Sequence, residues 1–260
     1  MSKLGLTPFE RISRQIDECD EIDERERIEL KLKSLNKFIK WTDQDYLEYE
    51  ILLANLKRVR RKSKPSTSEL GKALEDVVDF IFNKSFIYKV HSNKRSSTHE
   101  IDQFIVLSDR GIQTIHSLGV SRELLPTTQH YFLGECKNYK NPVGATWVGK
   151  FNTLMEVSGK CQLGIIFSCG GLTGKEQNWE NSHGLTKVIH YLSDPSAKRY
   201  ILDFNMADFE LLNENRNINV FDIIKSKKRA LEGCLDSQQL LADKHEGYED
   251  IKDIFDEINN

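Results

Sequence analysis

The sequence predicts an α/β protein, with a mixed central sheet flanked by helices and a helical extension at the N-terminus. Two observations support this fold class. From residue 86 onward, short apolar runs typical of buried strands alternate with longer segments whose apolar residues recur at helical spacing. Residues 8–62, in contrast, show helical periodicity only, with a high density of charge. A chain of 260 residues is long enough for one large domain with such an extension.

The N-terminal extension is expected to form two helices, arranged as a hairpin. The first carries apolar residues at helical spacing and is expected to end near Trp41. Thr42, with Asp45 three residues later, predicts the N-cap of the second helix. Because both helices are highly charged, we expect their narrow apolar stripe to pack on the domain or on a partner chain.

A basic segment ends this extension. Residues 57–64 hold six lysines and arginines, although the whole chain has a formal net charge of −3. Such a segment can engage phosphates locally, even in an acidic protein. The alternative is an ordinary solvated helix end and linker, which the helix dipole favours. We place the extension and its basic linker at residues 1–64.

The following segment opens with a third helix, because Ser66 and Glu69 form a capping-box pattern ahead of an apolar stripe. Polar turns then separate short apolar runs. The sequence predicts, in order, a strand at 86–91, a basic turn at 92–98, a strand at 100–107, a turn at 109–111, a strand at 111–116 and an excursion over 117–129 before a strand that contains Glu135.

Helices and strands alternate over the rest of the predicted domain, which we place at residues 65–234. A three-strand meander followed by helix–strand–helix–strand predicts the mixed sheet. The run 163–168 is dense in apolar residues, as suits a central parallel strand. The remaining residues, 235–260, form an acidic amphipathic tail that we expect to be a docking or dimerisation helix. The other predicted elements are helices at 146–159 and within 175–192, a strand at 199–204, and helices at 206–213 and 217–234.

The composition argues against several classes of protein. No apolar run approaches the length of a membrane span, and residues 1–8 do not resemble a signal peptide, so we expect no membrane association. The five cysteines are far apart and lack a C-x-x-C pattern. We therefore expect a cytoplasmic protein without a disulfide framework or a structural zinc site.

The residues most indicative of chemistry are two carboxylates on neighbouring strand-like runs. Asp102 lies within the run 100–107, and Glu135 follows an apolar run, with Lys137 two residues later. Side chains at i and i+2 of a strand point to the same face, so Glu135 and Lys137 should project together, and Cys136 to the opposite face. Two convergent carboxylates can hold a divalent cation, and an adjacent ammonium can orient and help deprotonate a water for attack on phosphorus.

The Glu-x-Lys triplet alone is uninformative, because the chain contains a second copy. Glu29 and Lys31 belong to an amphipathic helical pattern in which such charges form a solvated face. The distinguishing feature is the order of a helical Glu75, a strand with Asp102 and a strand with Glu135. The alternative is a structural role, in which Glu135 pairs with its neighbouring lysine at a sheet edge and Asp102 caps a bulge.

This order of motifs resembles the PD-(D/E)xK nuclease superfamily, and within it the Mrr-like restriction endonuclease branch. The resemblance covers roughly residues 66–230. It implies a restriction-endonuclease-like sheet, a magnesium-dependent endonuclease that hydrolyses DNA, with Mn2+ as a substitute for Mg2+, and a role in restriction or anti-phage defence. The segments that carry it are Leu74–Asp76, Glu100–Asp102, Gly134–Asn138, Val148–Phe151 and Gly164–Phe167.

The resemblance also assigns roles. Asp102, Glu135 and the backbone carbonyl of Cys136 would ligate the metal. Lys137 would position the attacking water and offset charge on the transition state. Glu75 would bind a second cation or orient a water, since a glutamate on this helix often joins the active site of the family.

Substrate and partners are less sharply defined. Lys94, Arg95, Lys140 and Lys150 are candidates to hold a DNA backbone, and the alternative for each is an ordinary surface cation. DNA is the expected partner, together with a second copy of the chain or a partner protein bound through the N-terminal helices or the tail. Two other functions stay open: a non-catalytic binding or assembly module on a nuclease-like fold, and a nuclease for RNA or branched DNA.

Overall fold

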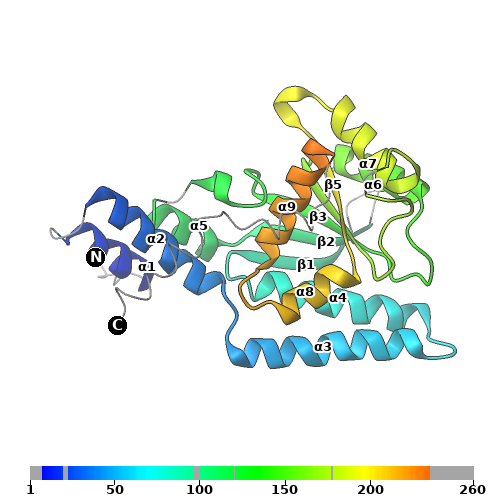
Figure 1. Cartoon of the computed structure of the whole chain (residues 1–260), viewed down its shortest axis with the longest axis horizontal. Coiled ribbons are helices and arrows are strands. Elements are labelled where there is room, and N and C mark those ends of the chain that lie inside the picture. Colours follow the sequence, from blue (N-terminus) through cyan, green and yellow to red (C-terminus); the bar gives the residue numbers. More distant parts are fainter. Residues whose placement is uncertain (1–7, 20–22, 96–99, 120, 177, 235–260) are drawn as a thin grey trace.

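One mixed sheet of five strands forms the centre of the part of the chain that the structure describes. This part comprises residues 8–19, 23–95, 100–119, 121–176 and 178–234 of a computed structural model. The strand order along the sheet follows the chain, and helices flank both faces, so the structure is α/β (Figure 1). The strands are β1 (Tyr88–Arg95), β2 (Glu100–Leu107), β3 (Tyr131–Cys136), β4 (Leu163–Phe167) and β5 (Tyr200–Phe204).

The sheet changes from antiparallel to parallel at β3. The strands β1, β2 and β3 form an antiparallel meander, whereas β3, β4 and β5 are parallel to one another. All five residues of β4 are buried, as expected for a central parallel strand covered on both faces. The carboxyl ends of β3, β4 and β5 therefore share one edge of the sheet.

Helices cover the two faces of the sheet. On one face the rings of Phe132 and Phe167 both contact Phe82 of a helix that precedes the sheet. On the other face the helix after β3 lies so close that a Cβ on Gly164 would be 2.6 Å from Phe151. The helices are α1 (Pro8–Asp17), α2 (Glu24–Ile39), α3 (Asp43–Arg61), α4 (Thr67–Asn83), α5 (Asp109–Ser117), α6 (Ala145–Val157), α7 (Asn181–Leu192), α8 (Met206–Glu214) and α9 (Val220–Gly233), with short 3-10 turns at Arg122–Leu124 and Pro195–Ala197.

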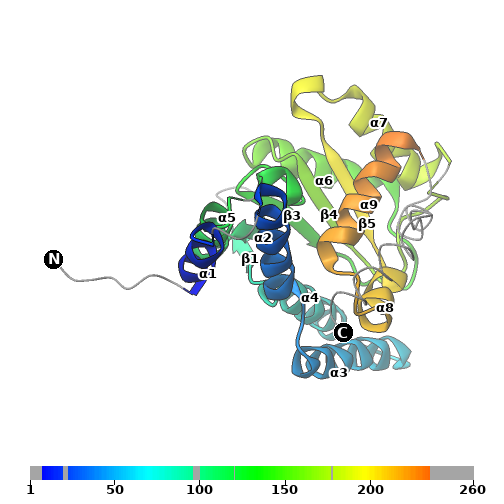
Figure 2. The same cartoon turned by 60° about the vertical axis from the view of Figure 1, so that its left-hand side comes forward.

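The N-terminal part contains three described helices, so the expectation of two helices between residues 8 and 62 was wrong. A new helix starts after Asp23, whose side chain accepts a hydrogen bond from the backbone N–H of Glu26 at 2.9 Å. The helix α1 packs on α2 and on α5, away from α3 (Figure 2). Lys31 of α2 forms an ion pair with Asp17 of α1, at 2.7 Å.

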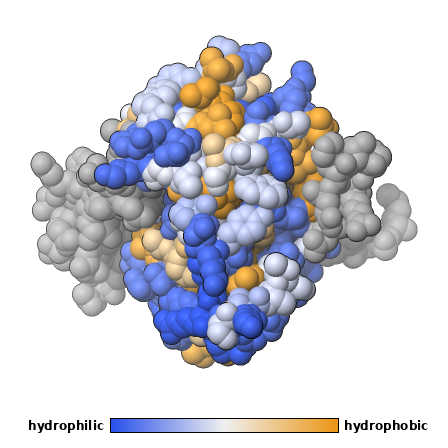
Figure 3. Space-filling model, turned by 90° about the vertical axis from the view of Figure 1, so that its right-hand side faces the viewer, coloured by the Kyte–Doolittle hydropathy of each residue, from blue (hydrophilic) through white to orange (hydrophobic). Residues whose placement is uncertain are grey.

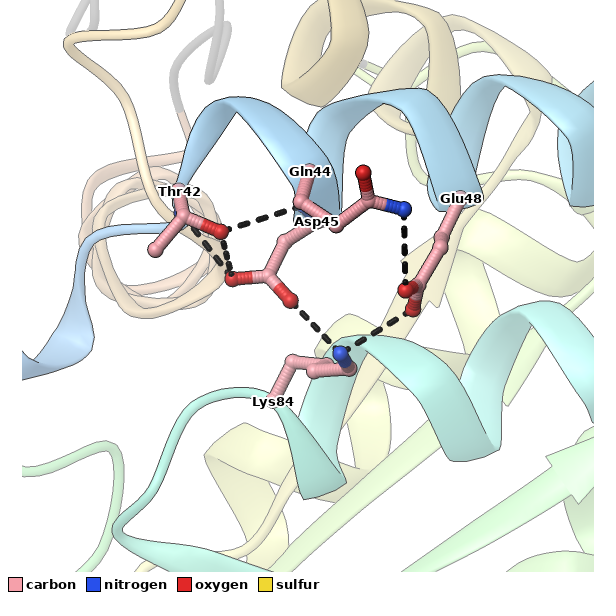
Figure 4. A network of polar contacts seen from close by, with 5 residues as sticks. All are labelled: Thr42, Gln44, Asp45, Glu48 and Lys84. Carbon is pink, nitrogen blue, oxygen red and sulfur yellow. Dashed lines mark hydrogen bonds and ion pairs between the residues drawn. The ribbon is translucent and has the colours of Figure 1, made fainter.

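The helix α3 packs along α4 and is part of the central core. Its buried residues Tyr49, Leu53, Leu56 and Val59 belong to the same apolar cluster as the sheet residues. The predicted N-cap is present, because Thr42 and Asp45 form a reciprocal capping box. Figure 4 shows that Lys84, at the end of α4, binds Asp45 at 2.6 Å and Glu48 at 3.0 Å. The start of α3 is thereby fixed to the end of α4.

The segment expected as a strand at 111–116 is instead the helix α5. Ser108 caps it by accepting a hydrogen bond from the backbone N–H of Gly111. Gly111 lies so close to the residue before β1 that an added Cβ would be 2.3 Å from the carbonyl oxygen of Ile87. The Ser108 cap and the helical turn satisfy the first backbone N–H groups of α5 locally. This local structure prevails over the alternating apolar pattern that had favoured a strand.

Most other elements agree with the sequence-based expectation. The strand β2 has the expected bounds, and Ser66 with Glu69 forms the predicted capping box at the start of α4. The strand β1 begins later than expected and extends through part of the predicted basic turn, to Arg95. In the described ranges, no helix combines the length and the apolar character that a bilayer span requires.

Candidate active site

The antiparallel pairing of β2 with β3 brings the two predicted carboxylates together. Gln103 is paired with Gly134, so Asp102 and Glu135 are the next residues along their strands and face each other. Opposed residues of an antiparallel pair project from the same face. Gly134 has no side chain, and an added Cβ would lie 2.9 Å from Phe167, so only glycine permits this close packing before Glu135.

Lys137 lies between the two carboxylates. Its Nζ is 2.5 Å from Oε1 of Glu135 and 3.4 Å from Oδ2 of Asp102. The side chains of Lys137 and Glu135 project to the same face, as expected from their i and i+2 positions. They are only 14% and 13% exposed, and that of Asp102 is 22% exposed. Three charged groups of a half-buried site therefore face one another.

Burial and mutual repulsion set the protonation of this site. Burial raises the pKa of Glu135, the negative charge of Asp102 raises it further, and Lys137 only partly offsets these effects. Burial by itself would lower the pKa of Lys137, but the charges of Glu135 and Asp102 outweigh it and the net shift is upward. The lysine is therefore held as an ammonium, next to a carboxylate whose ionisation is disfavoured.

A tryptophan that the sequence-based analysis did not single out completes the surroundings of Lys137. The Nζ of Lys137 lies 4.7 Å from the ring centroid of Trp147, on α6, which is a cation–π distance. Lys150, one turn further along α6, lies at the same distance from the same ring. Trp147 and Lys150 are three residues apart on a helix, so their contact could have been predicted from the sequence. The contact of Lys137 with Trp147 depends on how α6 packs on the sheet.

Three comparisons were made with known proteins. No family model, curated protein or solved structure matches this chain.

Cys136 and the helix α4, which carries Glu75, lie on one face of β3, opposite to the face of Glu135 and Lys137. The thiol of Cys136 is buried, and its pKa is raised first by burial and then by the charges of Asp102, Glu75, Glu135 and Asp79. A buried thiol of this kind remains neutral, so a metal ligand from Cys136 would be its backbone carbonyl, as the resemblance implies. Glu75 is half-buried on α4, within electrostatic range of the strand that carries Glu135.

The structure brings together only part of a metal-ligand set. Among the side chains that it describes, no group of three or more His, Cys, Asp and Glu residues has an arrangement suited to a metal ion. Asp102 and Glu135 converge as a pair. Two carboxylates suit Mg2+, which usually keeps several waters and takes one or two carboxylates together with substrate phosphate oxygens.

A polar cluster around Gln103, the residue after Asp102, was also not predicted from the sequence. Ser92 of β1 lies 2.9 Å and 3.0 Å from the two carboxylate oxygens of Asp79 and 3.1 Å from Oε1 of the buried Gln103. A hydroxyl has one proton and cannot donate to all three oxygens. Turning the Gln103 amide over would let its Nε2, otherwise without a partner, donate to Ser92. This cluster ties α4 to the strand that carries Asp102.

A second buried charged cluster lies two strands from Glu135. Asp203 of β5 is in register with Ile166 of β4, which is in register with Glu135, so Asp203 and Glu135 project from the same face. Burial raises the pKa of Asp203 to about 6, although Lys227 opposes the shift. Lys227 also pairs with Asp208 at 3.1 Å. The cavity at this cluster has a volume of about 30 Å3, which suits a single water better than a substrate.

The predicted nucleic-acid contacts are only partly placed. Lys150 is exposed on α6 beside Trp147. Lys94 and Arg95 end β1, but their side chains lie outside the part that the structure describes, as does the whole tail 235–260. Within the basic segment 57–64, Lys57 pairs with Glu210 at 2.7 Å and Lys62 with Glu69 at 2.8 Å.

The side of the molecule on which α3 ends and α4 begins, next to Asn138, is largely hydrophilic (Figure 3). The C-terminal end of α3 and the N-terminal end of α4 lie at the right of Figure 1, and this side faces the viewer in Figure 3. Hydrophilic residues dominate its middle and lower parts. Apolar side chains gather at the top of this view. A charged substrate would meet a polar surface around the site.

Proposed function

We propose that the protein is a magnesium-dependent endonuclease of the PD-(D/E)xK type, which hydrolyses phosphodiester bonds of DNA. The observation that carries this proposal is the convergence of Asp102, Glu135 and Lys137 on one face of β2 and β3, all less than a quarter exposed. The mixed sheet, with these residues at the carboxyl end of β3, is compatible with a restriction-endonuclease-like fold. Burying charged groups costs desolvation free energy, and a catalytic role would account for that cost at Asp102, Glu135 and Lys137.

The site residues fit a divalent cation. Asp102 and Glu135 offer two carboxylates to one point, and the carbonyl of Cys136 would be a further oxygen ligand. The raised pKa of Glu135 arises first from burial and then from repulsion by Asp102, and a divalent cation would relieve the repulsion. When bound, Mg2+ or Mn2+ would act as a Lewis acid on the phosphoryl group.

The chain's own residues would provide positioning and charge stabilisation. Lys137 is held as an ammonium, so it would donate hydrogen bonds that orient the attacking water and would offset negative charge on the pentavalent transition state. Trp147 would keep this ammonium near the site when the carboxylates turn to a metal ion. Glu75 would bind a second cation or orient a water from the α4 side.

Substrate contacts would extend along α6. Lys150 is exposed next to the site and is suited to a phosphate of the DNA backbone. In the alternative of a non-catalytic binding module, the N-terminal helices and the basic segment 57–64 would carry the function. The ion pairs of Lys57 and Lys62 with carboxylates of the same chain weigh against that alternative. The biological role that we propose is restriction or anti-phage defence in the cytoplasm.

Cleavage of supercoiled plasmid over a titration of Mg2+ and of Mn2+ tests the proposal. We expect nicked and linear products from the wild type that depend on the metal, and none from Asp102→Asn. Glu29→Gln neutralises a carboxylate of the second Glu-x-Lys triplet, on α2, and should leave cleavage unchanged. Cleavage of RNA in place of DNA would redirect the substrate assignment, and metal-independent cleavage would refute the mechanism.

A further inference from the structure

The last turn of α3 contacts the segment that follows Lys137. The guanidinium of Arg60 donates from Nη1 to Oδ1 of Asn138, at 2.6 Å, and to the backbone carbonyl of Tyr139, at 2.9 Å. The same guanidinium lies near Cys169, where burial raises the pKa of the thiol to about 11 and Arg60 partly offsets the rise. Arg60 therefore sits at the ends of both β3 and β4.

Asn138 connects this contact to a second helix. It is only 7% exposed, and its Nδ2 donates to the carbonyl of Leu70 in the first turn of α4, at 2.7 Å. The amide group of Asn138 thus has its acceptor satisfied by α3 and its donor by α4. A buried amide that lost one of these partners would carry the desolvation cost of an unpaired polar group.

The backbone of Lys137 depends on this arrangement. Its N–H donates to the carbonyl of Phe167 at 2.8 Å, which continues the β3–β4 pairing just beyond the end of β3. The chain leaves the sheet directly afterwards, so no further strand pairing holds the backbone that carries the ammonium. Strand ends with few supporting bonds are among the first parts of a fold to open. The hydrogen bonds of the Asn138 side chain to α3 and α4 hold the backbone at this point instead.

Arg60 is itself held firmly. Val59 beside it is buried against the core, and the ion pairs of Lys57 with Glu210 and of Lys62 with Glu69 flank it along the chain. The opposite end of α3 is fixed by Lys84 (Figure 4). The position of α3 can therefore determine the position of the backbone at the end of β3.

We propose that Arg60 is a positioning residue of the site: through Asn138 and the Tyr139 carbonyl it fixes the backbone of Lys137, so that α3 is required for turnover and not only for binding. This inference rests on the proposed nuclease function. It also makes α3, which the sequence analysis placed in a separate extension, a part of the site. A partner that moved α3 would change the catalytic rate without touching the carboxylates.

The test compares Arg60→Ala, Arg60→Lys and Asn138→Ala with Arg58→Ala. Arg58 is an exposed arginine of the same helix whose guanidinium donates to Oδ1 of Asn55 at 2.7 Å, so Arg58→Ala is a matched change of charge. Two quantities are measured: kcat and KM for plasmid cleavage, and amide hydrogen exchange of residues 133–141. The exchange measurement does not require activity.

We expect Arg60→Ala and Asn138→Ala to lower kcat by about ten- to a hundredfold with little change in KM, because only the positioning of Lys137 is lost. Amide exchange at Lys137 and Asn138 should rise by about tenfold or more. Arg60→Lys should recover part of both effects, and Arg58→Ala should retain the wild-type kcat and exchange.

Two outcomes would overturn the inference. One is an unchanged kcat with a raised KM in Arg60→Ala, which would make Arg60 a substrate contact. The other is wild-type exchange at residues 137–139 in both Arg60→Ala and Asn138→Ala. If the wild type cleaves no nucleic acid, the proposed function fails, and the exchange measurement still decides whether Arg60 fixes the strand end.

Discussion

The carboxylate of Asp102 accepts a hydrogen bond from the backbone N–H of Cys136, with 3.1 Å between nitrogen and oxygen. This bond crosses from β2 to the end of β3, so Asp102 helps to fix the strand that carries Glu135 and Lys137. A hydrogen bond to an ionised acceptor is among the stronger ones. Asp102→Asn keeps an acceptor oxygen at this position, and is therefore a better probe of charge than Asp102→Ala.

Divalent cations should stabilise the folded protein through Asp102 and Glu135. A cation present at about ten times its dissociation constant adds about 1.4 kcal/mol to the free energy of unfolding. In a chain of this size that raises Tm by about 2–4 °C. We expect this shift in wild type and in Glu29→Gln, and its loss in Glu135→Gln, by thermal unfolding with Mg2+ or Mn2+. An equal shift in Glu135→Gln would place the cation elsewhere.

The stability of the metal-free protein should carry the pH signature of Glu135. Burial, and then the charge of Asp102, raise the pKa of Glu135 in the folded state above its ordinary value. Between the ordinary and the raised pKa the folded state binds more protons, so the free energy of unfolding falls as pH rises. Relative to Glu135→Gln, the wild type should lose stability as pH increases through this window. Urea unfolding at a series of pH values measures the difference, and parallel pH profiles would contradict the assignment.

Trp147 should affect turnover through Lys137. Replacing it with leucine removes a cation–π contact worth about 0.5–2 kcal/mol, and about 1.4 kcal/mol corresponds to a tenfold change in rate. We therefore expect Trp147→Leu to lower kcat by about tenfold with KM nearly unchanged. Trp179→Leu is the matched control, because the ring centroid of Trp179 lies 5.6 Å from the ammonium of Lys187, a residue of α7. Equal effects of the two variants would argue against a role for Trp147 at the site.

The close approach of α5 to Ile87, just before β1, should make Gly111 sensitive to substitution. A Cβ there would lie 2.3 Å from a backbone oxygen, which cannot rotate away, so Gly111→Ala should destabilise the fold by about 2–3 kcal/mol. Gly149→Ala, in α6, has no heavy atom within 4 Å of the added Cβ. It should stabilise the protein by about 0.5–1 kcal/mol, because alanine favours helix. Urea unfolding of both variants tests the packing of α5.

The starts of α3 and α4, which depend on residues close together in the sequence, were predicted correctly. The capping boxes at Thr42 and Ser66 each involve residues three apart, and both are present in the structure. The same rule explains the error at α5, where the cap formed by Ser108 was overlooked because Asp109 to Gly111 reads as a turn. The apolar alternation that followed then favoured a strand.

Contacts between distant residues were not predictable in this way. Arg60 and Asn138 are separated by 78 residues, and the basic segment that contains Arg60 indicated only a phosphate contact or a solvated helix end. The convergence of Asp102 with Glu135 was expected from the resemblance, although the strand expected at 111–116 would have separated their strands in chain order. Because that segment is the helix α5, β2 and β3 are neighbours in the sheet. Trp147 was missed, since nothing in the sequence indicates which helix covers the face that carries Lys137.

The most direct test of the proposed mechanism is cleavage of supercoiled plasmid by wild type and Lys137→Ala, with and without Mg2+. Lys31→Ala, which removes the lysine of the second Glu-x-Lys triplet and its ion pair with Asp17, is the control. We predict metal-dependent cleavage by wild type and by Lys31→Ala, and a loss of at least about a hundredfold in Lys137→Ala, as for removal of one preorganised charge-stabilising group. Cleavage that persists in Lys137→Ala, or that needs no metal, would contradict the assignment of Asp102, Glu135 and Lys137 as a nuclease site.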